Sequence, residues 1–351
     1  MSMYPLQITP ICQEKVWGGT RLRDLFGRET DNDHIGESWD ISVRDDAMSI
    51  VANGSEKGKT LAQLFKEDPR SYLGSEVPTD EIFPLLIKIL DADDNLSIQV
   101  HPNDEEAQRL DNYPKGKSEM WYVLKSPEDG ELIIGLKDGV TREDYEKAVE
   151  NGTVEEIFGR LKVEPGDVVN IPPGLIHALT KGGIVAEIQQ NCDITYRIYD
   201  YGRKGLDGKP RELHLEKALE VTDFDGKISK EKAPGIVIQG KDEKITYYVV
   251  NPIFAVLLEE VGGTVHKATN PAHFTTYTCV GGAGKLSAGG VTIDIMYGDS
   301  VFLPAALGDY TLSGDMKLLC SFVPTNMERD ILAPLHEAGI SDEEIHAKLT
   351  I

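Results

Sequence analysis

The sequence predicts a mainly β protein with two β-barrels, and two observations lead to this prediction. Short runs rich in β-branched and aromatic residues recur along the chain, and several are followed by Pro, Gly or Asp. Regularly spaced short strands with turn residues between them are typical of a sandwich or a barrel. In addition, residues 166–172 (GDVVNIP) resemble residues 298–304 (GDSVFLP). Two barrels of one type are the simplest explanation of this repeat.

Weaker similarities along the chain support the repeat. Residues 99–101 resemble 264–266, and residues 121–135 resemble 277–290. Because these similarities come in the same order as the first one, chance is a less satisfactory explanation. The β-rich runs expected to form strands are 49–53, 96–100, 119–124, 131–135, 168–171, 184–190 and 195–199.

Helices are expected at a few places between the strands. Residues 60–66 are one candidate. Residues 141–150 are a better one, because Thr141 is a suitable N-cap and Asp144, three residues later, forms an approximate capping box. Residues 154–161 are expected to follow as a second helix, which would give a small helical insertion between two strands.

The end of the chain is also expected to be helical. A first stretch covers residues 328–338, where Pro334 should kink or break the helix because it lacks a backbone N–H. A second stretch covers 341–349, with Ser341 as a plausible N-cap next to acidic residues of the first turn. The sequence does not indicate whether this tail covers a barrel edge or mediates a contact.

The expected domain organisation follows from the repeat. The boundary should lie in the charged, strand-poor stretch 225–244. We therefore expect an N-terminal catalytic domain over 1–235 with a helical insertion near 137–160, a C-terminal domain over 236–325 without metal ligands, and a helical tail over 326–351.

Composition limits the classes of partner. The chain has 351 residues, with 59 acidic and 36 basic side chains and a formal net charge of -23. Such a surface repels nucleic acid and anionic membranes, so neither is an expected partner. An acidic protein that binds an anionic substrate must concentrate its few bases locally, which makes any basic cluster near a candidate site informative.

Cysteine usage and the N-terminus favour a cytoplasmic location. Cys12, Cys192, Cys279 and Cys320 are scattered and form no CxxC pair, so we expect reduced thiols, with one disulfide as the less favoured alternative. The start MSMYP lacks the basic and apolar regions of a signal peptide. No stretch approaches the roughly 20 apolar residues that a membrane span requires.

Two pairs of polar residues have the spacing of side chains that share one face of a strand. Gln99 and His101 are two residues apart, as are Lys117 and Glu119. Side chains at i and i+2 of a strand point to the same side, so each pair should project together. Taken alone, His101 could be a surface histidine before a turn, and Glu119 could lie on a solvated strand face.

His177 completes a set of candidate metal ligands. It follows the rigid turn Pro172–Gly174, which restricts its direction. Two imidazoles and one carboxylate (His101, His177 and Glu119) are a ligand set that Zn²⁺ and similar divalent ions accept in catalytic sites, where one position stays open for water or substrate. Gln99 could add a neutral oxygen.

The spacing around His177 resembles the second cupin motif, through Gly166, Pro172, Gly174 and His177. The first cupin motif usually reads His-x-His with a Glu soon after, and this chain departs from it. Gln99 takes the first His position, and Glu119 lies much further on.

Among cupins, this departure resembles the zinc-dependent mannose-6-phosphate isomerases, in their short bacterial form. The similarity covers about residues 5–325, and the insertion at 137–160 is compact, as in the short form. The other segments that carry the similarity are 17–19 (WGG), 36–39 (GESW), 84–88 (PLLIK), 97–102 (SIQVHP), 117–121 (KSEMW), 187–190 (EIQQ), 195–197 (TYR) and 200–203 (DYGR).

The resemblance implies both a fold and an activity. The fold would be two cupin-type (jelly-roll) β-barrels, and the activity would be interconversion of mannose 6-phosphate and fructose 6-phosphate. One Zn²⁺ per chain would polarise the substrate oxygens without redox chemistry. The partner would be a small phosphorylated sugar, and the protein would be a monomer or a homodimer.

The expected site residues include several bases. The resemblance points to Arg197 as a catalytic residue. Because arginine stays protonated, its role would be to hold enediolate or phosphate oxygens, unless it forms a structural ion pair with Glu187 or Asp193. Lys117 shares a face with Glu119 and should contact the substrate, in a catalytic and binding role, unless it is a solvated strand-edge residue. The adjacent bases Arg203 and Lys204 could bind the phosphate, or could be ordinary turn charges.

The general base and the competing functions stay open at this point. Metal-bound water, Glu187 or another inward group could move the proton, and Glu187 could also bind substrate. The alternatives to this activity are isomerisation of another sugar phosphate, a non-catalytic sugar-phosphate-binding cupin, and a metal-dependent dioxygenase. A dioxygenase usually needs a third histidine where this chain has Gln99, and no Gly-rich nucleotide-binding loop is present.

Overall fold

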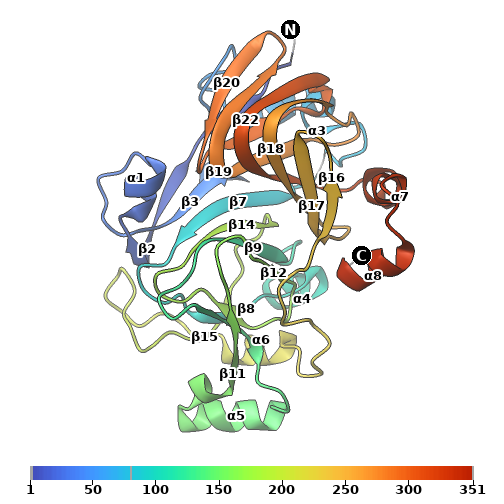
Figure 1. The fold of residues 1–351 in the computed structure, drawn as a ribbon. Helices are drawn as coiled ribbons and strands as arrows, with labels where there is room; N and C mark the ends of the chain where they lie inside the picture. Colours follow the sequence, from blue (N-terminus) through green and yellow to red (C-terminus); the bar gives the residue numbers. More distant parts are fainter. Residues whose placement is uncertain (1–2, 80, 350–351) are drawn as a thin grey trace. The chain divides into compact units, whose positions relative to one another are not determined.

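The computed structural model describes residues 3–79 and 81–349. The chain is mainly β, as predicted (Figure 1). Within the described residues, no helix is both long and apolar enough to cross a bilayer. The chain forms two compact units. A C-terminal unit contains residues 1–11, 39–88 and 233–351, and a central unit contains residues 12–38 and 89–232.

These units divide the chain differently from the predicted ranges 1–235 and 236–325. The reason is long-range strand pairing within the C-terminal unit. Strand β1 (Leu6–Thr9) pairs with β21 (Ser300–Leu303), with Leu6 opposite Phe302, and on its other side pairs with β6 (Ile50–Val51). Two N-terminal segments therefore complete a sheet whose other strands come from the C-terminal part of the chain.

The C-terminal unit is built on a nine-stranded sheet with the order β16-β17-β18-β22-β19-β21-β1-β6, in which β20 pairs with β19. Its remaining elements are the hairpin β4–β5, the helices α2, α3, α7 and α8, and short helical turns at Ala305–Leu307 and Glu328–Leu332. The bounds are β4 (Val43–Arg44), β5 (Ala47–Met48), α2 (Leu61–Glu67), α3 (Pro69–Leu73), β16 (Ile236–Gln239), β17 (Glu243–Val250), β18 (Ala255–Ala268), β19 (Thr275–Ala288), β20 (Val291–Met296), β22 (Asp309–Phe322), α7 (Ala333–Glu337) and α8 (Asp342–Lys348).

The three long strands of this unit are sharply bent, as Figure 1 shows for β18, β19 and β22. Glycines lie side by side across them, because Gly263 is opposite Gly314 and Gly314 is opposite Gly284. Lys267 Nζ lies 2.7 Å from Glu259 Oε2 on the same strand, although these residues would be roughly 26 Å apart in a straight strand. The bend brings Glu259 and Lys267 of β18 together.

The end of the chain packs on the core of the same unit. Ile331, Leu335, Ile345 and Leu349 belong to the apolar cluster that the inward side chains of the long strands form. The helical turn changes type at Ala333, directly before Pro334, which lies in the first turn of α7. Proline is tolerated in a first helical turn because its missing N–H has no partner there.

The central unit contains a five-stranded sheet, β11-β10-β13-β8-β15, and a six-stranded sheet, β12-β9-β14-β7-β3-β2. Strands β2, β3 and β7 also have residues in the C-terminal unit. The bounds are β2 (Ile11–Gly19), α1 (Arg21–Phe26), β3 (Ile35–Ile41), β7 (Leu85–Asp91), β8 (Ile98–Val100), α4 (Asp104–Asp111), β9 (Glu119–Lys125), β10 (Glu131–Leu136), α5 (Arg142–Asn151), β11 (Phe158–Lys162), β12 (Val168–Ile171), β13 (His177–Ala178), β14 (Ile184–Gln190), β15 (Tyr196–Tyr199) and α6 (Leu215–Val221).

The predicted second helix of the insertion, residues 154–161, is wrong. Val154–Ile157 form a single 3₁₀ turn, and the chain continues as β11, which pairs with β10. Phe158 is buried there, and the exposure of the following residues alternates along the strand. Hydrogen bonding to the edge of an existing sheet overrides the helical preference of this segment.

Candidate metal centre and substrate site

The register of the five-stranded sheet places three predicted site residues in one row. Gln99 on β8 lies opposite His177 on β13 and opposite Arg197 on β15. Directly paired residues of neighbouring strands project to the same face. Strand β8 therefore brings together residues that are far apart in the sequence.

Glu119 comes to the same place from the six-stranded sheet. It begins β9 and lies opposite Ile171 and Gln189. Its Oε1 is 3.1 Å from His177 Nε2, and its Oε2 is 3.7 Å from His101 Nε2. The potential ligand atoms of these three side chains all lie within 4.8 Å of one another, and all three residues are buried.

Backbone carbonyls hold both imidazoles in one orientation. The Nδ1 atoms of His101 and His177 lie 2.9 Å from the carbonyl oxygens of Ile194 and Leu175, respectively. An Nδ1–H that donates to a carbonyl leaves Nε2 deprotonated and available to a metal. Both Nε2 atoms face the Glu119 carboxylate.

The turn before His177 depends on Gly174. Gly174 has a positive φ of 89°, its N–H donates to the carbonyl of His101 at 3.0 Å, and an added Cβ would lie 3.0 Å from the Val221 carbonyl oxygen. Glycine is favoured in this left-handed conformation. The turn thus connects the two histidines directly through the backbone.

The buried polar atoms at the centre of this cluster fit a divalent cation. Within the described part of the chain, His101 Nε2 and both carboxylate oxygens of Glu119 have no aligned hydrogen bond, although the Lys117 ammonium lies 3.0 Å from Glu119 Oε2. Burying such atoms without a partner is costly. Two imidazole nitrogens and a carboxylate match the ligands of zinc in catalytic sites.

Electrostatics keep these groups in the protonation states that ligate a metal. Burial lowers the pKa of His101 well below its usual value, and the nearby Lys117 lowers it further. Burial acts to raise the pKa of the Glu119 carboxyl. Lys117 and the two histidines outweigh it, and they hold this pKa well below its usual range.

Lys117 lies beside the carboxylate, as the strand spacing predicts. Its Nζ is 3.0 Å from Glu119 Oε2, and its side chain is only 5% exposed. The structure therefore does not place Lys117 at a solvated strand edge. Its ammonium group can contribute positive charge next to any substrate oxygen held at the cluster.

Gln99 lies at the edge of the cluster in a less favourable orientation. Its Nε2 is 3.4 Å from His177 Nε2, and its Oε1 accepts a hydrogen bond from Ser97 at 3.3 Å. An amide nitrogen does not ligate a cation, so the predicted ligand role requires the opposite orientation of this amide.

Arg197 connects the cluster to a second group of charges. Its Nε donates to Ser97 Oγ at 3.3 Å, and its Nη1 donates to the Glu212 carbonyl at 2.8 Å. Burial lowers the pKa of the Arg197 guanidinium, and the neighbouring Arg211 adds to this effect. Since Ser97 also donates to Gln99, a continuous polar path leads from the candidate metal ligands to Arg197.

The other predicted substrate residues occupy different environments. Arg203 lies beside Asp200 and Asp94, at 2.9 and 3.3 Å, whereas Lys204 is exposed. Glu187 is buried, and its Oε2 accepts a hydrogen bond from the indole of Trp121 at 2.8 Å. Arg211, which the sequence did not single out, donates its Nε to Asp200 at 2.7 Å. No local motif identifies Arg211 in the sequence. It comes near Arg203 only because the intervening residues 204–210 fold back on themselves.

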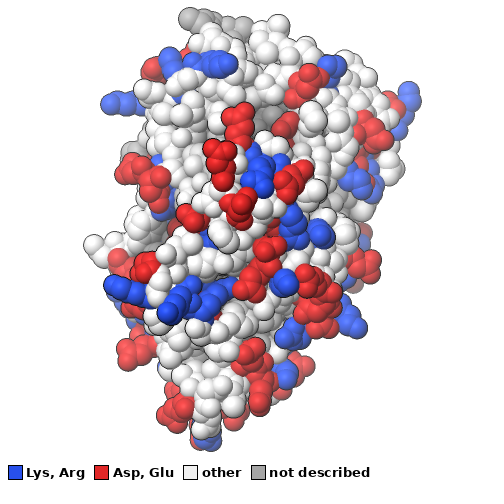
Figure 2. Space-filling view, turned by 90° about the vertical axis from the view of Figure 1, so that its left-hand side faces the viewer, with Lys and Arg blue, Asp and Glu red and all other residues white. Residues whose placement is uncertain are grey.

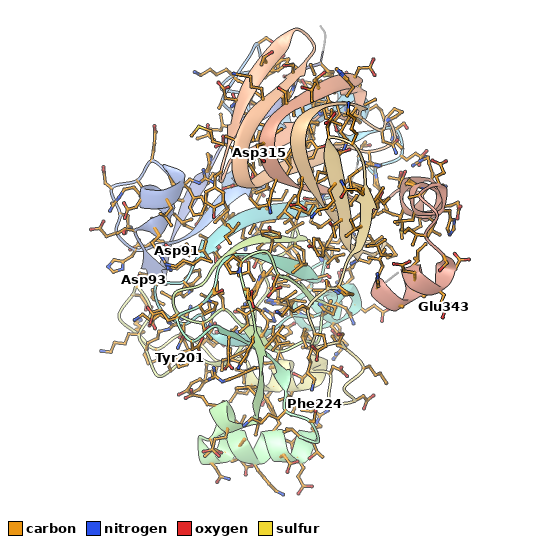
Figure 3. All side chains as sticks on the ribbon, viewed as in Figure 1. Asp91, Asp93, Tyr201, Phe224, Asp315 and Glu343 are labelled. Carbon is orange, nitrogen blue, oxygen red and sulfur yellow. The ribbon has the colours of Figure 1, made fainter. Side chains whose placement is uncertain are left out.

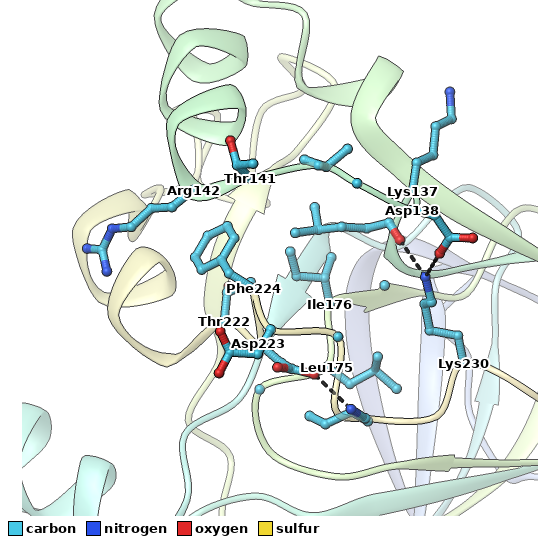
Figure 4. A pocket seen from close by; sticks show the side chains of 18 residues that line it. Lys137, Asp138, Thr141, Arg142, Leu175, Ile176, Thr222, Asp223, Phe224 and Lys230 are labelled. Atoms are coloured by element: carbon cyan, nitrogen blue, oxygen red, sulfur yellow. Dashed lines mark hydrogen bonds and ion pairs between the residues drawn. The ribbon is translucent and has the colours of Figure 1, made fainter.

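A cavity of about 390 Å³ lies elsewhere in the central unit (Figure 4). Its lining includes Ile176 and Phe224, and Lys230 bonds there to Asp138 and to the Leu136 carbonyl. None of the predicted site residues lines this cavity in the described part of the chain. It is therefore separate from the candidate metal centre, although its residues 174–176 immediately precede His177.

Comparisons with known proteins identify the family. Residues 5–145 match the family model "Phosphomannose isomerase type I, catalytic domain", and residues 244–323 match "Mannose-6-phosphate isomerase, cupin domain". Over 320 residues the chain is 38% identical to the probable mannose-6-phosphate isomerase GmuF of Bacillus subtilis, covering 91% of this chain and 99% of that protein. The chain belongs to the mannose-6-phosphate isomerase family.

Further relatives support this membership. Mannose-6-phosphate isomerase ManA of B. subtilis is 37% identical, with 92% of this chain and 99% of that protein covered. A crystal structure of the mannose 6-phosphate isomerase from B. subtilis superposes with a TM-score of 0.83 at 35% identity, covering 90% of this chain and 99% of that one. A mannose 6-phosphate isomerase bound with zinc and yttrium shares the fold, with a TM-score of 0.71 at 15% identity. The mainly β fold with a cupin domain is thereby confirmed.

Proposed function

We propose that this chain is a metal-dependent aldose–ketose isomerase that interconverts mannose 6-phosphate and fructose 6-phosphate. The observation that carries this proposal is the buried cluster of His101, Glu119 and His177, whose potential ligand atoms lie within 4.8 Å of one another. Family membership supports the substrate and the reaction. The partner would be a small phosphorylated sugar, handled by a cytoplasmic monomer or homodimer.

One Zn²⁺ per chain is the cofactor we assign to this cluster. His101, His177 and Glu119 would hold it, with Gln99 as a possible fourth ligand. The mannose 6-phosphate isomerase of the same fold that is bound with zinc and yttrium supports this choice. Two neutral imidazoles and one carboxylate leave a bound divalent cation with net positive charge, so it would polarise the carbonyl and adjacent hydroxyl of a sugar as a Lewis acid.

The surrounding side chains supply the rest of the chemistry. Isomerisation moves a proton between C1 and C2 and develops negative charge on an enediolate. Lys117, beside Glu119, would stabilise that charge as a buried ammonium group. Arg197 would hold enediolate or phosphate oxygens through the guanidinium N–H groups that Ser97 and the Glu212 carbonyl leave available. Glu187 would contact a sugar hydroxyl with its carboxylate, which the Trp121 indole orients.

Arg203 and Lys204 are proposed to meet the phosphate end of the substrate. This role is supported by the position of Arg203, which donates to Asp200 and is close enough to Arg197 to interact with it electrostatically. Lys204 is exposed, so its contribution would be a longer-range attraction for the anion rather than a defined contact.

We also infer that the chain contains two cupin-type jelly-roll barrels. The first would carry the site and a small helical insertion near 137–160, and the second would lack metal ligands, followed by a helical tail over 326–351. The strand register supports this interpretation. Trp121 lies opposite Val169 on β12, and Tyr277 lies opposite Val301 on β21, which occupies the same place in the sequence repeat.

The test is mannose 6-phosphate turnover by the purified protein before metal stripping, after stripping, and after return of Zn²⁺. We expect activity to disappear on stripping and to recover with zinc, and we expect little turnover of glucose 6-phosphate. The matched control is exposure of the stripped protein to Mg²⁺, which prefers oxygen ligands. Absence of turnover in fully zinc-loaded protein would contradict the proposed reaction. The remaining functions would then be isomerisation of another sugar phosphate or non-catalytic binding of a sugar phosphate.

A further inference from the structure

Two arginines contact one buried carboxylate in the central unit, and a third, Arg197, lies close enough to interact with it electrostatically. Arg203 and Arg211 both donate to Asp200, whose side chain is only 5% exposed. Arg211 makes two such contacts, one through Nε and one through a terminal nitrogen, in the forked geometry typical of arginine–carboxylate pairs. Asp200 therefore holds two guanidinium groups from different parts of one loop.

A tight turn directs Arg203 back to this carboxylate. Tyr201 and Gly202 both have positive φ, at 56° and 67°, and the N–H of Arg203 donates to the Asp200 carbonyl at 3.1 Å. Two consecutive positive φ values define a type I′ turn, in which Asn-Gly is the usual central pair. A tyrosine in this conformation is uncommon, because its side chain makes the left-handed backbone conformation energetically costly.

Ring contacts compensate for part of that cost. The Arg203 guanidinium lies over the ring of Tyr201, 5.5 Å from its centre, and the ring of Tyr199 packs against Tyr201 at 5.0 Å (Tyr201 is labelled in Figure 3). Backbone strain that persists at an ordered position is often associated with a functional site. Here the strained residue and the aromatic contacts hold one cation in place.

The remainder of the loop folds back so that Arg211 lies near Arg197. Lys204 pairs with Pro210, and the N–H of Gly205 donates to the Lys209 carbonyl at 2.7 Å, so the loop folds back as a small hairpin. The carbonyl of Glu212, the residue after Arg211, accepts the Arg197 Nη1 hydrogen bond. Arg197, Arg203 and Arg211 are thus neighbours around a single site.

The less exposed part of this cluster has more positive than negative charge. Arg197, Arg203 and Arg211 lie near Asp200, whereas the side chains of the other nearby carboxylates, Asp94 and Glu212, are 60% and 83% exposed. Arg203 Nη2 lies 2.9 Å from Asp200 Oδ1 but makes no well-aligned hydrogen bond among the described residues. In a chain with a formal net charge of -23, a local excess of arginine next to the candidate site favours an anionic ligand. On the face in Figure 2, by contrast, basic side chains are interspersed with acidic ones.

We propose that Asp200 is a positioning residue that holds Arg203 and Arg211 for the phosphate group of the substrate, and that Arg211 is a further phosphate-binding residue. The inference rests on the proposed function, because it assigns the phosphate end of the same substrate. Arg197 lies between this cluster and the metal ligands, so one sugar phosphate can contact both. The competing explanation is a purely structural ion-pair network that stabilises the loop.

The experiment compares zinc-loaded wild type with Arg211→Ala, Arg211→Lys and Asp200→Asn. Arg160→Ala is the control, because it removes the same charge from an exposed pair with Asp129. The first readout is kcat/KM for mannose 6-phosphate and for unphosphorylated mannose. The second is the dissociation constant of inorganic phosphate, measured by calorimetry. Melting temperatures check that each variant is folded.

For Arg211→Ala we expect kcat/KM on mannose 6-phosphate to fall about 10- to 100-fold, which is the usual effect of losing a hydrogen bond between charged groups. The phosphate dissociation constant should rise by a similar factor, and turnover of mannose should stay within about twofold. Arg211→Lys should recover part of the loss, because it keeps the charge but not the forked contact. Asp200→Asn should raise KM more than it lowers kcat.

The inference would be overturned if Arg211→Ala lowers kcat/KM equally for mannose 6-phosphate and mannose, or if it leaves the phosphate dissociation constant unchanged. Either result would favour a purely structural ion-pair network. If wild type binds phosphate but does not turn over mannose 6-phosphate, the proposed reaction fails, and the calorimetric arm still decides the role of Arg211. If Arg211→Ala does not fold, Arg211→Lys must show the loss of phosphate affinity, and wild-type affinity in that variant would count against the inference.

Discussion

Two regions of the molecule carry the matching sequence segments 166–172 and 298–304, but the residues around these segments differ in their chemistry. In the central unit, Glu119 lies opposite Ile171 on β12, and His177 lies opposite Gln99 on β8. In the C-terminal unit, Leu303 on β21 corresponds to Ile171, and the residue opposite it is Thr275. Asp309 corresponds to His177, and the residue opposite it is Ala268. The candidate metal ligands are therefore found in the central unit, and Thr275, Asp309 and Ala268 take the corresponding positions in the C-terminal unit.

The C-terminal unit has buried charges of its own, but they satisfy one another. Lys267 lies 2.7 Å from both Glu243 and Glu259. Tyr277 donates to Glu259 at 2.9 Å and lies 2.7 Å from the hydroxyl of Tyr310. In the central unit, Glu119 has an ion pair with Lys117 at 3.0 Å, but its oxygens also converge with the Nε2 atoms of His101 and His177, and none of them makes an aligned hydrogen bond within the described residues. A network whose groups are all hydrogen-bonded indicates a structural role, whereas two imidazoles and a carboxylate that converge in this way indicate a metal site.

The largest expected effect comes from the carboxylate of the candidate metal site. Glu119→Gln removes the anionic ligand of the buried cluster, so we expect zinc affinity and kcat/KM each to fall by about 10³-fold or more, which corresponds to about 4 kcal/mol. Metal analysis and steady-state kinetics measure both quantities. The matched control is Glu259→Gln, which changes a buried carboxylate of the C-terminal unit and should keep zinc bound in the folded protein. Normal zinc content in Glu119→Gln would refute the ligand assignment.

Breaking the satisfied network should reduce stability without affecting the metal. Lys267→Met leaves Glu243 and Glu259 close together without their shared cation, which should cost about 3–5 kcal/mol in the free energy of unfolding. Urea denaturation measures the loss, and zinc content per folded chain should not change. Lys285→Met, which disrupts an exposed pair with Asp294, should cost less than about 1 kcal/mol. A loss of zinc in Lys267→Met would show that the two regions are not independent.

The bend in the C-terminal unit should be sensitive to one glycine and tolerant at another. Gly282 has a positive φ of 70°, and an added Cβ would lie 2.0 Å from the Asp315 carbonyl oxygen. Gly282→Ala should therefore lower the free energy of unfolding by about 2–3 kcal/mol. Gly262 has open space around an added Cβ, so Gly262→Ala should change stability by less than about 0.5 kcal/mol. Equal effects of the two substitutions would contradict the role of backbone conformation in the bend.

The smallest effect concerns the start of the tail. Asp330 accepts hydrogen bonds from the N–H groups of Thr325 and Asn326. Burial acts to raise its pKa, but Arg329, these N–H groups and His273 together hold it below its usual value. Asp330→Asn should cost about 1–2 kcal/mol near neutral pH.

The pH dependence of that cost has a defined sign. The folded pKa of Asp330 lies below the unfolded value of about 3.9, so its stabilising effect is complete above the unfolded pKa and disappears as the pH falls through the folded pKa. The stability difference between wild type and Asp330→Asn, measured by urea denaturation, should therefore be constant from about pH 6 to 8 and shrink below about pH 4. A difference that grows on acidification would show that the carboxylate is not stabilised in the folded state.

Helix starts were predicted well where capping residues are local. The expected helices at 60–66 and 141–150 correspond to α2 and α5, each with a capping box at its N-cap threonine. The expected helix at 341–349 corresponds to α8, capped by Ser341. Helix α4 was not predicted, although Asn103 and Glu106 form a capping box that the sequence also displays.

The sequence repeat coincides with one strand in each unit, but its weaker matches do not follow the strand register. Its strongest match, 166–172 with 298–304, corresponds to β12, which lies at the end of its sheet, and to β21, which lies between β19 and β1. The weaker match of Gln99 with Thr264 does not agree with the strand pairing, because Gln99 pairs with His177 as Ala268 pairs with Asp309. Strand β18 has 14 residues, whereas β8 has three, so equivalent residues of the two segments are separated by different numbers of residues. A sequence comparison without gaps does not detect such a change in spacing.

By itself, the sequence determined which residues could act together over short distances. The two-residue spacings, the turn before His177 and the capping boxes are local consequences of strand, turn and helix geometry. Only the tertiary structure decided that Glu119 meets the histidines from a second sheet, that Arg211 shares Asp200 with Arg203, and that β1 pairs with β21. These contacts depend on pairing between segments distant in the sequence, where register and burial are set by the whole sheet and no local pattern encodes the partner.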